Sequence, residues 1–328
     1  MTGNLRNTII AACFGVMLTA CGGGSSGSTP DPNPTGNSGE LVVITMDNAQ
    51  LTAGVVAGVA LGDGVFGALS GLELPTIPGV VGAIGTGAAK ITNSSQMLAT
   101  SSAMVDCAAF GTVDIDVTVA NPLQPTEGDI YALQFAQCDD GTGVVMHGGM
   151  IMTITGLDGD FESGGFLLGV RTELSAFQVT EAGETTGANG TVTVAIDSRT
   201  PPLTTITVST SALATSSEGT AEAVTDLTLT ISEDQSAFPT AVSVETSFTI
   251  DSPRIGGEVR VSTSLTLQAS GDEYPYVGEL RVSGAGNSAI VIIALDANRV
   301  RLEIDIDGDG AFDETLETTW DELMALTG

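Results

Sequence analysis

Apolar and polar residues alternate along most of the chain after Gly111. In residues 258–268, Val259, Val261, Leu265 and Leu267 form the apolar set, and polar residues, mainly Ser and Thr, fill most other positions. Alternation of this kind gives each strand one apolar and one polar face, as in antiparallel sheets. It predicts strands at residues 144–155, 165–179, 190–197, 203–213, 223–232, 241–250, 258–268, 276–283, 289–295 and 300–305.

The connections between these segments are short and rich in turn residues, as in 139–141, 181–183 and 270–272. Such connections suit β-hairpins, and there is no alternation of helix and strand that would indicate a parallel sheet. We therefore expect a mainly β fold: a large antiparallel up-and-down meander, curved into a half-closed, barrel-like sheet. A β-sandwich is the alternative. A short C-terminal helix over residues 318–326 is expected, capped by Thr318 or Thr319, with Trp320, Leu323 and Met324 packed against the sheet.

Residues 40–91 differ from the sheet because they are apolar and rich in glycine. Residues 41–45 are predicted to form a strand, and Asp47 or Asn48 is expected to cap a helix over 50–61. A second short helix is expected over 80–89. These helices either pack on the apolar face of the sheet or form a mobile lid over a hydrophobic cavity or a segment that inserts into a membrane.

The N-terminal residues have the pattern of a processed leader. Leu18, Thr19, Ala20 and Cys21 resemble a bacterial lipobox, in which the cysteine receives the lipid. The expected organisation is a lipoprotein signal peptide at 1–20, a lipidated Cys21 with a flexible linker at 21–39, and one β-rich domain at 40–328. Within this domain, residues 107–328 form the sheet. In families with this lipobox, an aspartate directly after the lipidated cysteine favours retention in the inner membrane. Gly22 occupies that position here, and the resemblance therefore implies an outer-membrane lipoprotein.

Two cysteines, Cys107 and Cys138, remain beyond Cys21. An even pair in an exported chain indicates a disulfide. Residues 112–119 and 130–137 read as two strands of a hairpin, whose open ends such a bridge would join. Free thiols or a metal pair are the alternatives.

An acidic loop near the C-terminus carries Asp305, Asp307 and Asp309, followed by Gly310. Carboxylates at alternate positions before a glycine match the start of a calcium loop. The Ala311 carbonyl and Asp313 could complete the ligand set. The loop departs from an EF-hand because a strand precedes it and Leu316 stands at position 12 in place of glutamate; Glu314 and Glu317 are the candidates to replace that ligand. We expect Ca²⁺ as cofactor; an acidic turn with solvated aspartates is the alternative.

The charge and the missing motifs exclude several functions. With 40 acidic and 9 basic side chains, the net charge of −31 argues against nucleic-acid binding. There is one histidine, His147, and there is no nucleophile elbow, P-loop or zinc motif. We therefore expect no enzymatic activity, with a hydrolase that uses paired carboxylates as the remaining alternative.

The lipobox, the cysteine pair and the block at residues 278–323, which contains the acidic loop, together resemble a group of uncharacterised β-rich lipoproteins of proteobacteria. The resemblance implies a fold and an outer-membrane location, on either the periplasmic face or the cell surface. The expected function is a non-enzymatic structural or binding module, stabilised by calcium and a disulfide. Its partners are the membrane, through the lipid, and a hydrophobic ligand or envelope protein. The alternative is a periplasmic carrier of lipid in the concavity of the sheet.

Overall fold

A computed structural model describes residues 39–61, 100–121, 125–139, 141–160, 165–217, 220–271 and 273–327. The expected signal peptide, Cys21, nearly all of the linker and the second predicted helix at 80–89 lie outside these residues. None of the described helices combines the length and hydrophobicity needed to cross a membrane.

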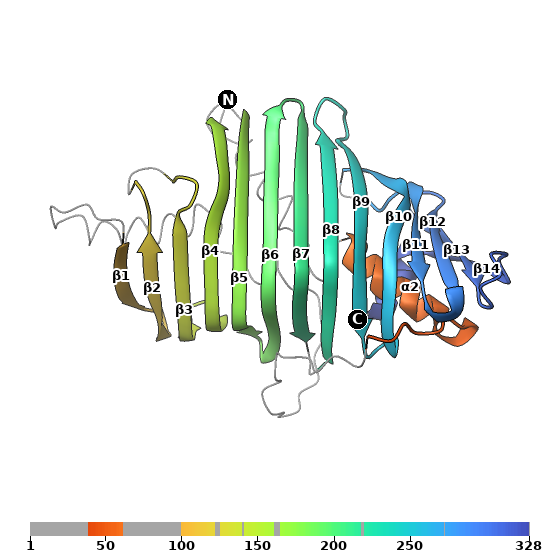
Figure 1. Cartoon of the computed structure of the whole chain (residues 1–328), viewed down its shortest axis with the longest axis horizontal. Coiled ribbons are helices and arrows are strands. Elements are labelled where there is room, and N and C mark those ends of the chain that lie inside the picture. The colour runs from red at the N-terminus through yellow and green to blue at the C-terminus, as the bar shows by residue number, and fades with distance from the viewer. Residues whose placement is uncertain are drawn as a thin grey trace.

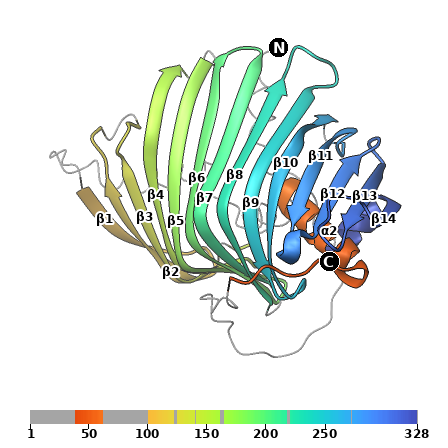
Figure 2. The same ribbon diagram turned by 45° about the vertical axis from the view of Figure 1, so that its right-hand side comes forward.

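The described strands form one antiparallel sheet in which each strand pairs with its neighbours in sequence, from β1 to β14. This confirms the predicted up-and-down meander. The sheet is curved and does not close into a barrel (Figures 1 and 2). All described strands belong to this one sheet, so the chain does not form the alternative sandwich.

Most strands are longer than the alternating segments suggested, although the strands at Val277–Ser283 and Ala289–Ala294 are one residue shorter. The strand at Glu314–Thr319 was not predicted, and it includes Thr318, the first residue of the predicted helix. The sheet also begins earlier than residue 107. The first strand was not predicted because its sequence, TSSAMVD, has no regular alternation. The strands are β1 Thr100–Asp106, β2 Phe110–Thr118, β3 Ile130–Asp139, β4 Val145–Asp160, β5 Gly165–Glu181, β6 Glu184–Thr200, β7 Leu203–Ser217, β8 Thr220–Asp234, β9 Ala241–Ser252, β10 Gly257–Ser270, β11 Val277–Ser283, β12 Ala289–Ala294, β13 Arg299–Asp305 and β14 Glu314–Thr319.

One face of the sheet carries the apolar core. Leu213, Val224 and Ile250 lie side by side on β7, β8 and β9, and each is at most 1% exposed. At the far end of the same sheet, helix α2 (Met46–Leu61) contacts β12 and β13 and packs against the C-terminal helix α5 (Trp320–Met324). Alanine and glycine dominate the buried residues of α2, and such small side chains let helix and sheet approach closely.

The predicted strand at 41–45 is wrong: the chain makes only a parallel bridge between Leu41 and Glu258. The reason is local, because the Asn48 side chain accepts a hydrogen bond from the Thr45 N–H at 2.8 Å and donates one to the Val43 carbonyl. These two bonds turn the chain into a helix that starts at Met46, about one turn before the predicted residue 50.

The C-terminal helix is confirmed, with Thr319 as its cap. The Thr319 hydroxyl accepts from the Glu322 N–H, and the Glu322 carboxylate accepts from the Thr319 N–H. Trp320 is fully buried, donates from Nε1 to the Pro275 carbonyl at 3.2 Å and stacks on Tyr274.

A series of bulges bends the strands, and glycines make these bulges possible. Gly111, Gly148 and Gly190 have positive φ angles of 82°, 94° and 139°. A Cβ at these positions would lie 1.9, 2.1 and 2.4 Å from carbonyl oxygens of the next strand, at Gln137, Ala176 and Ala212. The pairing register shifts around each glycine. Because a bulge bends its strand and increases the twist, this series contributes to the curvature of the sheet.

Replacing Gly148 with alanine tests this account. We expect Gly148→Ala to lower the free energy of unfolding by about 2–5 kcal/mol, because a strained φ adds to a clash with the Ala176 carbonyl. Gly143→Ala is the control, since Gly143 has a similar φ of 93° but no atom within 4 Å of its Cβ position. It should lose only about 1–2 kcal/mol in urea denaturation. Equal losses would contradict the role of close strand packing.

Candidate metal centre

The acidic loop connects β13 to β14. Asp305 is the last residue of β13, and Asp313 directly precedes β14. The Asp313 N–H donates to the Ile304 carbonyl at 2.8 Å, which closes the loop at its base. The hairpin therefore brings the first and last aspartates of the motif together.

Asp305 is the buried residue of the group, with 2% of its surface exposed. Its Oδ1 accepts from the Gly308 N–H at 2.7 Å, and its Oδ2 accepts from the Gly310 N–H at 3.0 Å. A buried carboxylate needs such hydrogen bonds to offset its lost hydration. Both carboxylate oxygens are thus held inside the loop.

Asp307 and Asp313 are exposed and complete a group with Asp305 that could hold a metal ion. One carboxylate oxygen from each residue lies within 4.8 Å of the other two. Oxygens on opposite sides of a calcium ion are about 4.6–5.2 Å apart, given Ca–O distances of about 2.3–2.6 Å. The spacing therefore suits a hard cation with oxygen ligands.

Asp309, a predicted ligand, lies outside this group of three. Its Oδ1 accepts from the Ala311 N–H at 2.7 Å, and its own N–H donates to Asp307 Oδ1 at 3.1 Å. Ligation by the Ala311 carbonyl stays a prediction. Leu316 pairs with Leu302 in the sheet, and neither Glu314 nor Glu317 belongs to the group.

The short 3₁₀ turn η1 (Ala285–Asn287) lies close to the acidic loop, next to Gly308. A Cβ on Gly308, whose φ is 75°, would lie 2.2 Å from the Gly286 carbonyl oxygen. Gly308 is therefore required for contact between two hairpin connections that are separated by β12 and β13. The acidic motif itself contains no signal for this contact.

The disulfide between Cys107 and Cys138 is confirmed, with a Cα–Cα distance of 5.4 Å. It joins the connection between β1 and β2 to the end of β3, and Cys138 is buried. His147 lies exposed on β4, opposite Gln178, and is not part of the acidic group. The lipidation site Cys21 lies outside the described residues.

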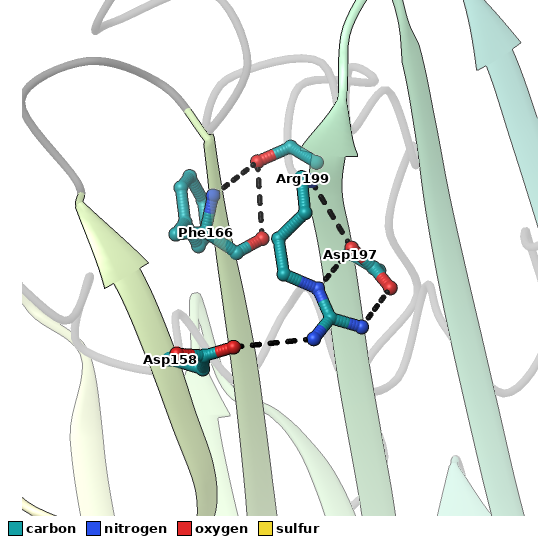
Figure 3. A network of polar contacts seen from close by, with 5 residues as sticks. Asp158, Phe166, Asp197 and Arg199 are labelled. Atoms are coloured by element: carbon teal, nitrogen blue, oxygen red, sulfur yellow. Dashed lines mark hydrogen bonds and ion pairs between the residues drawn. The ribbon is translucent and has the colours of Figure 1, made fainter.

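A second polar cluster joins β4 and β6 at one rim of the sheet (Figure 3). The Arg199 guanidinium donates to both oxygens of Asp197, at 3.0 and 2.7 Å, and reaches Asp158 at 3.2 Å. Beside it, the Ser198 hydroxyl bonds to the backbone of Phe166 on β5. The hydrogen bonds from Arg199 hold the pKa of Asp197 at about 2, below its ordinary 3.8.

A depression of about 550 Å³ lies over β5 to β8, where the bulges interrupt the sheet. Its lining is mostly polar. The alternating sequence pattern could not predict this depression, because its residues come from four different strands. The residues are Arg171, Thr191, Thr193, Ser209, Thr210, Ser211, Asp226, Leu227 and Thr228.

Comparison with models of known protein families finds none that matches this chain. Comparison with curated proteins likewise finds no match.

The Arg199 cluster makes a pH prediction. In Arg199→Gln, we expect the pKa of Asp197 to rise from about 2 toward 3.8, because its strongest hydrogen-bond donor is gone. The lowered pKa stabilises the fold above pH 3.8, and that stability is lost as the pH falls from 3.8 to about 2. NMR titration of the carboxyl carbons measures the shift. The control is Arg171→Gln, which removes the ion-pair partner of Glu173 and should leave the pKa of Asp197 unchanged. If the pKa of Asp197 in Arg199→Gln equals that of the unaltered protein, Arg199 is not the cause of the low pKa.

Proposed function

We propose that the chain is a non-enzymatic lipoprotein, anchored to the outer membrane through Cys21. Its β domain is a structural or binding module that one disulfide and a calcium ion stabilise. The observation that carries the proposal is the group of Asp305, Asp307 and Asp313, with Asp305 buried and the other two open to solvent. A calcium ion there would tie both ends of the loop together and offset two of the three carboxylate charges.

The anchor is proposed from the sequence. Leu18, Thr19 and Ala20 precede Cys21 as in a lipobox, and a run rich in Gly, Ser, Pro and Asn follows up to residue 39. The folded domain begins where this run ends. The Glu40 carbonyl accepts a hydrogen bond from the Glu258 N–H, and the Val42 N–H donates one to the Glu258 carbonyl. A flexible tether between lipid and domain agrees with this arrangement.

Calcium suits the loop better than zinc or copper because its candidate side-chain ligands are all oxygen atoms. The ion has a structural role in this proposal. The group sits between the last two strands, beside η1, and none of its three members is a histidine or cysteine.

The carrier alternative lacks comparable support from the described residues. The depression that they form is lined by Arg171, Asp226 and hydroxyl groups, which suit a polar ligand better than a lipid chain. Helix α2 is buried against α5, β12 and β13, as expected of a packed core element.

The anchor is tested with Cys21→Ala in the full chain, produced in a Gram-negative host. We expect the protein to lose its lipid and to leave the membrane fraction, because no acceptor thiol remains. The control is Cys13→Ala, which removes the other cysteine of the leader and should leave fractionation unchanged. Retention of Cys21→Ala in the membrane fraction, with an unchanged mass, would disprove lipid attachment at this residue.

Calcium binding is tested by urea unfolding of the full chain with and without 10 mM CaCl₂, a concentration about ten to one hundred times the Kd of weak extracellular sites. We expect a gain of about 1.4–2.7 kcal/mol in the free energy of unfolding. Asp307→Ala should abolish the gain, because it removes one ligand oxygen and one charge from the group of three.

Asp309→Ala is the matched control for this experiment. It makes the same charge change two residues away, outside the group, and should retain the gain. Loss of the gain in both variants would place Asp309 among the ligands, and a gain that survives Asp307→Ala would contradict the site.

A further inference from the structure

The two edge strands of the sheet are protected very differently (Figure 1). The outer strand β14 carries Glu314 and Glu317 and runs directly into helix α5. The outer strand β1 has no charged side chain and no proline from Thr100 to Val105. Proteins commonly protect sheet edges with charges or proline because an unpaired edge attracts another strand. β1 lacks both devices over six residues.

The pairing of β1 with β2 defines which of its backbone groups are free. The Cys107 N–H donates to the Gly111 carbonyl, and the register continues this pattern along the strand. In an antiparallel pair, successive residues bond alternately to the two sides. Ser101, Ala103 and Val105 therefore bond toward β2, whereas Ser102 and Met104 direct their N–H and C=O groups outward. No other described strand pairs with β1 on that side.

Most side chains of β1 are also exposed. Met104 is 69% exposed and Val105 is 40% exposed. Ala103 and Val105 lie opposite Ile115 and Val113, so they extend the apolar face of the sheet to its edge. A further strand beside β1 would continue this face next to Ala103 and Val105, and it would also lie beside Met104 on the opposite face.

We propose that β1 pairs antiparallel with β1 of a second copy of this chain, around a two-fold axis at Ala103. The strand is complementary to itself in this register: Ser102 lies opposite Met104 of the other copy, and the two residues exchange both backbone bonds. Each Asp106 falls opposite Thr100, so no like charges lie directly opposite each other. The dimer is isologous, and its two sheets form one continuous antiparallel sheet.

The disulfide prepares this edge for pairing. The bond between Cys107 and Cys138 holds the end of β1 against the buried end of β3 in the free protein. A strand that is already ordered loses less conformational entropy when it binds.

The charge of the chain gives the association a definite salt dependence. Each copy carries −31, so the two copies repel at long range, while the interface is held by backbone bonds between uncharged residues and has one charged residue per copy, Asp106 at its end. Added salt screens the repulsion and leaves the backbone bonds in place. We therefore expect the dimer to dissociate less readily as NaCl is raised.

Cysteine crosslinking of the full chain tests the proposed register. At the two-fold axis, the two Ala103 residues form a non-hydrogen-bonded pair with Cα atoms about 4.5 Å apart, within disulfide range. Ala103→Cys should therefore give a covalent dimer under mild oxidation. Ser101→Cys is the matched control on the same strand and face. Its Cα atoms would be about 13 Å apart in this register, so it should give about tenfold less dimer.

A third variant separates loss of pairing from loss of fold. Met104→Pro, added to Ala103→Cys, removes an outward N–H and leaves the bonds to β2 in place, so the crosslink should disappear while the native disulfide still forms. Three results would overturn the proposal: no dimer from Ala103→Cys at any salt concentration, equal dimer from Ser101→Cys, or an adduct whose mass shows a different protein.

Discussion

A single sheet with one apolar face has to bury that face without a second sheet, and this requirement governs the whole domain. Curvature brings the apolar rows of neighbouring strands toward one another, as in the edge-to-face contact of Phe135 on β3 with Phe177 on β5. Bulges at Gly111, Gly148 and Gly190 bend the strands, and α2 with α5 covers the end formed by β12 and β13. Replacing these glycines with larger residues would separate strands that depend on close backbone contact.

Most of the sheet could be predicted because its signals are local. The hairpin between β5 and β6 turns at Ala182 and Gly183, both with positive φ, in a predicted turn segment. The cap of α5 also depends on neighbours in sequence, Thr319 and Glu322. β1 escaped prediction because it is held by pairing with β2 and has no alternation of its own. The bulges escaped because a positive φ at Gln137 or Ala176 depends on the strand beside it.

The acidic loop was predicted in outline, and the details differ for the same reason. Spacing in the sequence grouped five positions, whereas the fold brings three carboxylates together. Asp305 belongs to the sheet, opposite Ala289 on β12, and its burial follows from that pairing. Asp309 lies in the loop and turns to a backbone N–H of the same loop. Two of the three grouped carboxylates are held at strand ends, Asp305 at the end of β13 and Asp313 directly before β14.

In this very acidic chain, the buried carboxylates among the described residues are Asp129, Asp139 and Asp305. Each accepts backbone N–H groups of its own connection, at Ala120 and Thr126, at Gly141, and at Gly308 and Gly310. Negative charge is therefore buried where it organises a turn. Asp158 and Asp197, in contrast, lie at the rim and share Arg199.

Because each strand pairs only with its neighbours in the chain, the sheet has no long crossover that would fix its strand number. Duplication or deletion of one two-stranded hairpin in the middle would restore the same pairing pattern on both sides. The acidic loop and the helical cover at one end, and the disulfide at the other, would be undisturbed. Such a domain can change its width through evolution by whole hairpins, while its two specialised ends stay the same.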